Sequence, residues 1–298
     1  MGKWIYECPI CGNAETIGTK TKISGFVKER IESDDIDIQL LHCTNCSFAF
    51  YDYRFSPEEE KKLYDMYRSD LYQRQREKHE CWYTARVNNA FNNNEKYLKE
   101  QQRVIEKVLR DNGYDRFDNA LDYGGNEGAT YLDKWGIKNK YVYDISGCEV
   151  LPNITKIDRK EDIRDLPLDF VMCNMTFEHL TSTTEIIDFY TKIGDANTIF
   201  YVEVPSEFPF SINKFSIKNN IGLLLNPNYN SWKLFLYYLK QRKEPFFTMK
   251  EHINFYTSNS LKTLIESYGF RTIDIQENYE MGALGKSKVL SILFKRQE

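Results

Sequence analysis

The sequence predicts an α/β protein, in which a doubly wound sheet of seven strands follows a small cysteine-rich unit. Two observations carry this prediction. From residue 120 onward, short apolar runs of strand character alternate with amphipathic helical segments, which is typical of a sheet with a helix between most of its strands. Two C-x-x-C pairs also lie within the first 46 residues. We expect the cysteine-rich unit at 1–53, a helical connector and cap at 54–113, and the sheet domain at 114–298.

The composition is that of a globular protein. The chain has 298 residues, of which 41% are hydrophobic and 28% charged, and this excludes a disordered chain. Forty basic residues stand against 44 acidic ones, with a net charge of −4. Nucleic-acid binders are more often basic, so nucleic acid is not an expected partner. No apolar run approaches the roughly 20 residues of a membrane span, and no signal peptide opens the chain, so we expect a cytoplasmic protein without a membrane partner.

Four of the seven cysteines form the two pairs, Cys8 with Cys11 and Cys43 with Cys46. The two-residue spacing lets a tight turn aim both sulfurs at one ion, and two such turns make a tetrahedral thiolate site suited to zinc. Four thiolates leave no open coordination position, so this zinc is expected to be structural. Four unrelated buried cysteines, or two redox pairs, are the alternatives. Alternating stretches at 20–41 indicate short strands, and 1–53 is therefore expected to be a zinc ribbon.

The connector is expected to be helical. Ser56, followed by Pro57 and Glu59, is a helix N-terminus signature. A second helix is expected at about 95–112, where Gly113 ends it.

The segment NALDYGGNEGATYLDKW is the first strand of the sheet with its turn. The strand ends at Asp122, Gly124 and Gly125 turn the chain, and Gly128 precedes an expected helix. Glycines at such a turn let the backbone approach a ligand at the carboxyl end of a parallel strand. The next strand, YVYDIS, ends in Asp144, where an acid hydrogen-bonds a ribose diol.

The remaining elements follow in order. Strands are expected at 153–157, 170–174, 198–204, 271–276 and 289–295, and helices at 184–193 and 258–269. A long aromatic insertion, 207–250, separates the fifth strand from the last helix.

These segments together resemble the class I S-adenosylmethionine-dependent methyltransferases. LDYGGNEG is similar to their first motif and YVYDIS to their second. LDFVMCNMTFEHL resembles the fourth strand and following turn of the small-molecule branch, and EHINFYTSNSLKTLIESYGF the run before its sixth strand. A four-cysteine ribbon joined by a Ser-Pro-Glu-Glu helix is similar to the ribbon-bearing methyltransferases of sugar-nucleotide and surface-glycan pathways.

The resemblance implies a Rossmann-like sheet that binds S-adenosylmethionine. The residues it implies for the cofactor are Asp122, Gly124, Gly125, Asn126, Gly128, Asp144, Asp162, Ile163, Asn174 and Met175. Asn126 replaces the middle glycine of the first motif, but Asn tolerates left-handed backbone. The stretch between strands three and four is short, and Asp162, followed by Ile163, is the candidate that contacts adenine. The chain ends at the seventh strand, whereas sugar C-methyltransferases with this ribbon carry a further domain, which favours methylation of oxygen.

Methyl transfer to a hydroxyl needs alignment and a base that removes the proton. His179 follows the fourth strand and His252 follows the insertion, so these two are the candidate bases; each can equally be a structural histidine. Glu203 and Tyr201 lie two apart near the end of strand five, on the same side. Glu203 is a candidate partner of the base, a ligand of the substrate or of a divalent metal, or a solvated carboxylate.

The insertion is expected to shape the acceptor pocket. Trp232 is a candidate to stack on a sugar or nucleobase, and Tyr201 and Arg242 are further substrate-binding candidates, with Arg242 near a diphosphate. An amphipathic lid that packs on the sheet is the alternative.

The expected function is O-methylation of a nucleotide-linked or phosphorylated sugar, for surface-glycan or natural-product biosynthesis. The alternatives are a sugar C-methyltransferase, an RNA methyltransferase and a non-catalytic protein that binds S-adenosylmethionine. The sequence leaves the identity of the acceptor, a catalytic divalent metal and the oligomeric state open.

Overall fold

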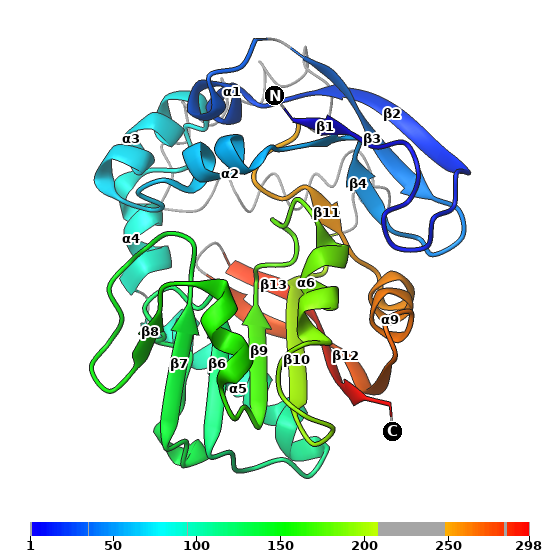
Figure 1. Cartoon of the computed structure of the whole chain (residues 1–298). Coiled ribbons are helices and arrows are strands. Elements are labelled where there is room, and N and C mark those ends of the chain that lie inside the picture. The colour runs from blue at the N-terminus through cyan, green and yellow to red at the C-terminus, as the bar shows by residue number, and fades with distance from the viewer. Residues whose placement is uncertain (1, 35, 94, 208–247, 283–284, 298) are drawn as a thin grey trace.

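A sheet of seven strands forms the centre of the computed structural model, which describes residues 2–34, 36–93, 95–207, 248–282 and 285–297 (Figure 1). The strand order is β12-β13-β10-β9-β6-β7-β8. Strands β8, β7, β6, β9 and β10 run parallel, whereas β13 is antiparallel to both of its neighbours. The sheet is therefore mixed, and its strands are β6 (Asn119–Tyr123), β7 (Asn139–Tyr143), β8 (Thr155–Ile157), β9 (Phe170–Asn174), β10 (Ile199–Pro205), β12 (Phe270–Gly282) and β13 (Gly285–Arg296).

Helices cover both faces of this sheet. Helix α5 (Glu95–Asp111) lies on one face, where its apolar side packs with Ala120 and Met172. Helices α6 (Thr183–Tyr190) and α9 (Ser258–Glu266) lie on the other face, with Leu121 and Val171 (Figure 1). Successive strand residues thus enter opposite cores, as the two-residue period of a strand requires. The predicted doubly wound arrangement is confirmed.

The helix that was predicted after Gly128 is a short 3₁₀ turn, Asp133–Trp135. Gly128 and Gly136 have φ values of 82° and 66°, so left-handed residues bracket this stretch of the chain. The span 129–135 between them has room for about two helical turns, but only Asp133–Trp135 is helical, and the prediction of a longer helix here was wrong.

The N-terminal unit contains a second sheet of order β11-β4-β3-β2. Helix α1 (Gly25–Ile31) interrupts the stretch for which only short strands were predicted, and Ser24 caps it by accepting a hydrogen bond from the Val27 N–H. The other elements of this region are β1 (Lys3–Trp4), β2 (Thr16–Lys22), β3 (Asp37–Cys43), β4 (Ala49–Tyr51) and β5 (Tyr53–Arg54).

One strand of this second sheet comes from the far end of the chain. Strand β11 (Asn254–Phe255) pairs with β4, and the Met249 N–H donates to the Lys22 carbonyl at 2.8 Å. The buried Arg54 guanidinium also donates to the Asn254 side chain at 2.7 Å. The expected unit at 1–53 is therefore completed by residues 249–255.

Three further helices stand beside this unit: α2 (Pro57–Tyr64), α3 (Asp70–His79) and α4 (Ala85–Asn93). Ser56 and Glu59 form a reciprocal capping box at the start of α2, as their spacing predicted. The N-terminal unit and these helices lie above the carboxyl ends of the parallel strands (Figure 1). Among the described residues, no helix is long and apolar enough to cross a membrane.

Candidate active site

A cleft of about 1460 Å³ lies at the carboxyl ends of β6, β7 and β9. Pockets for a single small ligand usually have about 300–1,000 Å³. The cleft therefore has room for two ligands side by side. Its walls come from the sheet, from helices α2 to α5 and from the segment 251–252.

The turn after β6 contributes backbone, and not side chains, to the wall of the cleft. Gly124 has a φ of 78°, and a Cβ atom there would lie 2.4 Å from the Thr176 hydroxyl. A Cβ atom on Gly125 would lie 2.4 Å from the Asp122 carboxyl carbon. Asn126 has a φ of 51°, so it adopts the left-handed conformation that its position in the motif requires. The turn thus exposes backbone to a ligand.

Asp144 joins this turn to the end of β7. Its Oδ2 accepts a hydrogen bond from the Asn126 N–H at 2.9 Å, and its Oδ1 accepts one from the Ser146 N–H at 2.8 Å. Asp122 lies beneath, 1% exposed, and neither of its carboxylate oxygens has a hydrogen-bond partner in the described part of the chain. Burial, with the nearby Asp144 charge, raises the pKa of Asp122 to about 8. Both acids line the cleft.

Asn174 and Met175 line the cleft where β9 ends. Met175 has a φ of 51°, and its N–H donates to the Glu203 carbonyl at 2.9 Å, which holds the turn open. Asp162 and Ile163 are not among the cleft residues. Ile163 is fully buried in the core of the α6 face, and Asp162 beside it is exposed to solvent, because adjacent residues of the short helix Lys160–Asp165 point in different directions.

The two candidate bases meet in the cleft. The rings of His179 and His252 lie 4.7 Å apart, centroid to centroid, although the two residues are 73 positions apart in the sequence. His179 Nδ1 lies 3.1 Å from the Glu251 carbonyl oxygen and 3.0 Å from the Tyr64 hydroxyl. His252 Nδ1 lies 3.0 Å from a carboxylate oxygen of Glu207.

The surroundings of the two imidazoles shift their pKa values in opposite directions. Burial, together with the neighbouring His252, lowers the pKa of His179 to about 3. Burial also opposes the charge on His252, but Glu207 and then Glu178 outweigh it and raise the pKa of His252 to about 9. Burial raises the pKa of Glu178, which precedes His179, to about 7.

Glu203 and Tyr201 share one side of β10, as predicted, but that side faces α5 and not the cleft. Both are fully buried. Tyr201 donates a short hydrogen bond to the Glu203 carboxylate, and the Ser291 hydroxyl donates to the same oxygen at 2.8 Å. Burial raises the pKa of Glu203 to about 8.

The carboxylates that accompany the histidines are Glu178 and Glu207 instead. Trp232 and Arg242 lie outside the described residues.

Arg68 is a cleft residue that the sequence did not single out. Its guanidinium carbon lies 4.9 Å from the ring centre of Tyr67 and 5.1 Å from that of Phe91. Among the described residues, no carboxylate lies within 4.0 Å of it, whereas Arg76 pairs with Glu251 at 2.7 Å. No motif marks Arg68, which stands in a stretch of mixed charges, so sequence patterns carry no signal for it.

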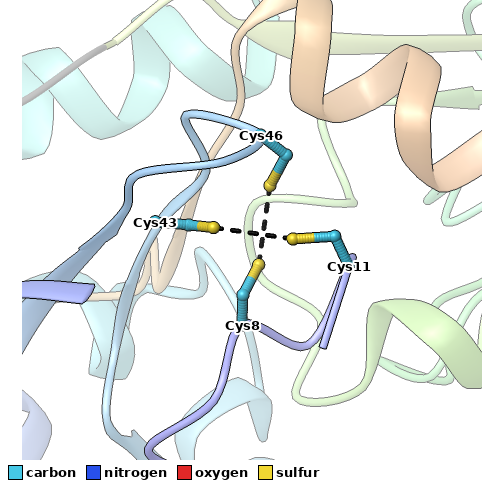
Figure 2. A group of neighbouring side chains, drawn as sticks. All are labelled: Cys8, Cys11, Cys43 and Cys46. Carbon is cyan, nitrogen blue, oxygen red and sulfur yellow. Dashed lines mark hydrogen bonds between the residues drawn. The ribbon is translucent and has the colours of Figure 1, made fainter. Parts of the chain in front are cut away.

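The four paired cysteines form one cluster in the N-terminal unit (Figure 2). The Sγ atoms of Cys8 and Cys46 are 3.5 Å apart, and those of Cys11 and Cys43 are also 3.5 Å apart. The close contacts thus run between the two C-x-x-C turns and not within either, which argues against two redox pairs. Four sulfurs at about 2.3 Å from a tetrahedral zinc would lie about 3.8 Å apart, so the cluster fits that ion.

Comparison with known proteins identifies the family to which the sheet domain belongs. A family model described as a methyltransferase domain matches residues 95–275. No sequence among the curated proteins matches the chain.

Several solved structures are similar in fold. An S-adenosylmethionine-dependent methyltransferase from Anabaena variabilis is 11% identical with a TM-score of 0.46, over 73% of this chain and 94% of that one. A putative S-adenosylmethionine-dependent methyltransferase from Listeria monocytogenes is 15% identical with a TM-score of 0.44, over 67% and 99%. Magnesium protoporphyrin IX methyltransferase from Synechocystis, with bound S-adenosylhomocysteine, is 11% identical with a TM-score of 0.39, over 65% and 84%.

Proposed function

Because the chain belongs to the methyltransferase-domain family, whose members are S-adenosylmethionine-dependent enzymes, we propose that it methylates a hydroxyl of a nucleotide-linked or otherwise phosphorylated sugar. The observation that carries this proposal is Arg68. A guanidinium that has no carboxylate partner among the described residues, and that lies against two aromatic rings in the cleft, is suited to a phosphate group on an acceptor. The rings offer flat apolar surfaces on which a sugar or base can stack.

We assign the donor to the wall built by the β6 turn. Asp144 is proposed to accept hydrogen bonds from the ribose hydroxyls, since two of its roughly four acceptor positions are taken by backbone N–H groups. The glycine turn and the backbone at 174–175 are proposed to contact the rest of the cofactor. Asp122 stands beneath this turn as a buried acid, and a cationic ligand above it would favour its charged form.

The acceptor hydroxyl is proposed to lie beside His179 and His252. We assign the ring proton of His179 to Nδ1, which then donates to the Glu251 carbonyl oxygen, and in this tautomer the Nε2 keeps its lone pair. That nitrogen is placed to receive the hydroxyl proton as the oxygen attacks the methyl carbon and the C–S bond breaks. Positioning of donor and acceptor in one enclosed cleft supplies much of the acceleration.

We further propose that Cys8, Cys11, Cys43 and Cys46 hold one structural zinc. The support is the clustering of the four sulfurs, three of them on buried residues. Metal analysis of freshly purified protein is expected to find about one zinc per chain in this site, and folded protein in which these thiols are free to react would contradict the assignment.

The test of the activity is a panel of acceptors. The purified enzyme and S-adenosylmethionine are incubated with nucleotide sugars, sugar phosphates and the matching unphosphorylated sugars. The expected result is one added methyl on a phosphorylated sugar, seen by mass spectrometry, with the methoxy carbon identified by carbon NMR. A C-methyl signal would shift the reaction to carbon. Methylation of neutral sugars alone would contradict the role given to Arg68.

A further inference from the structure

We propose that Glu178, His179 and His252 form a second metal site, separate from the cysteine cluster, which binds one divalent ion of the first transition series in the cleft. One nitrogen of each imidazole and one oxygen of the carboxylate lie within 4.8 Å of one another. All three residues line the cleft that would hold donor and acceptor. The catalytic role given to the ion rests on the proposed methyl transfer, but its binding does not.

The spacing of the three ligand atoms is close to that of a filled site. His179 Nε2 lies 3.8 Å from Glu178 Oε1. Ligands at about 2.1 Å from a tetrahedral ion stand about 3.4 Å apart. The 3.8 Å pair is thus about 0.4 Å wider than in a filled site, and the other pairs, at no more than 4.8 Å, are at most about 1.4 Å wider.

The outer hydrogen bonds of both histidines already orient them as ligands. His179 donates its Nδ1 proton to the Glu251 carbonyl, and His252 places its Nδ1 against the Glu207 carboxylate. In each ring this leaves Nε2 as the nitrogen that can bind a cation. Ligand histidines in proteins almost always donate their other nitrogen to a carbonyl or carboxylate in this way.

Glu178 supplies an independent observation. The residue is 2% exposed, and its Oε2 is buried without a hydrogen-bond partner among the described residues. A buried carboxylate oxygen without a hydrogen bond is unfavourable, whereas coordination of a cation removes the penalty. Oε2 therefore lacks a partner among the described residues at the place where the two imidazoles converge.

The ligand set selects the class of ion. Imidazole suits zinc, copper, iron and nickel better than magnesium or calcium, which prefer oxygen ligands, and the carboxylate also allows manganese. Three protein ligands leave open positions toward the cleft, as in catalytic sites. An acceptor hydroxyl bound there loses its proton to water in the open cleft, and its oxygen then attacks the methyl carbon while the C–S electron pair returns to sulfur. In that state His179 acts as a ligand and not as the base.

Binding of Mn²⁺ to the zinc-loaded protein tests the site directly. We expect one Mn²⁺ per chain by loss of the free-ion signal in electron paramagnetic resonance, with spin-echo modulation from imidazole nitrogen on the bound ion. His252→Ala and Glu178→Gln should weaken binding at least 100-fold, and Glu207→Gln about 10- to 100-fold. His79→Ala is the matched control, because that histidine pairs with Glu29 outside the cleft and should leave binding unchanged.

The outcomes separate this proposal from the proposed function. If no Mn²⁺, Co²⁺ or Zn²⁺ binds beyond the cysteine cluster, or if the bound ion shows no imidazole modulation, the site is overturned and Glu178 and His252 are an ion pair. That result stands whether or not sugars are methylated. Imidazole-bound Mn²⁺ without methylation of any phosphorylated sugar would support the site and contradict the proposed acceptor.

Discussion

Replacing Asp144 with Asn is expected to weaken cofactor binding by about 10²- to 10³-fold. The carboxylate holds two backbone N–H groups, one on each oxygen, at 2.9 and 2.8 Å. An Asn side chain keeps one oxygen and turns an NH₂ group toward the other N–H. The change removes a charge-assisted bond to the ribose, about 1.5–3 kcal/mol, and one anchor of the turn, about 1 kcal/mol. The sum of about 2.5–4 kcal/mol corresponds to the stated loss of affinity.

Calorimetry with S-adenosylhomocysteine, at one ionic strength, measures this loss. The lost anchor should also lower the melting temperature by about 2–4 °C, which shows that the variant still folds. Asp188→Asn is the control, because it removes an exposed carboxylate that pairs with Lys192 on α6 and should leave the affinity unchanged. A folded Asp144→Asn variant that binds within about threefold of the wild type would refute the placement of the ribose.

Three further outcomes follow from the structure. Arg68→Ala should raise KM for a phosphorylated acceptor about 10- to 100-fold with unchanged S-adenosylhomocysteine affinity, and Arg68→Lys should recover part of it; an equal loss with neutral acceptors would contradict the phosphate contact. Cys46→Ser should lose zinc and lower the melting temperature of the whole chain, seen by calorimetry, because Cys46 packs in the same core as α9; a metal-free variant that melts like the wild type would contradict this. Glu203 has a pKa raised to about 8 from 4.5, so its neutral form is favoured by folding, and the stability it contributes is present below pH 4.5 and lost as pH rises through about 8. Urea unfolding at pH 5 and pH 9 measures this loss as a difference in the free energy of unfolding. Glu203→Gln should abolish the contribution of Glu203 to that difference, and an identical pH dependence in the two proteins would contradict the prediction.

The sheet could be predicted because its strands are marked locally. Strand β9 was predicted with the bounds that it has, Phe170–Asn174, since a short apolar run bounded by polar residues is itself the signal of a buried strand. The stretch after Gly128 shows where prediction from the local sequence fails. Its apolar spacing was helical, but glycines with left-handed φ values stand at both ends, and a Cβ atom at Gly128 would lie 2.5 Å from Ile154, a contact that the local sequence does not reveal.

The candidate site also has a part that the sequence could predict and a part that it could not. The glycine turn and Asp144 lie near each other in sequence, and their spacing was sufficient to bring them together. The contact between His179 and His252 joins residues 73 positions apart, and Glu207 contacts His252 across the insertion. Glu203 was misplaced because periodicity shows that it shares a side with Tyr201 but not which side faces the cleft. Arg68 depends on rings from α4 and from the turn before α3, which no local pattern connects.

The origin of strand β11 bears on how the chain is made by the ribosome. The edge of β4 stays open until residues 254–255 emerge, about 200 residues after β4 itself has been synthesised. Contacts of such sequence separation form late, and an open strand edge is exposed to other chains in the meantime. The zinc proposed for the cysteine cluster could bind early, because all four thiols are made within the first 46 residues. Such binding would stabilise the N-terminal sheet during elongation, before its last strand is available.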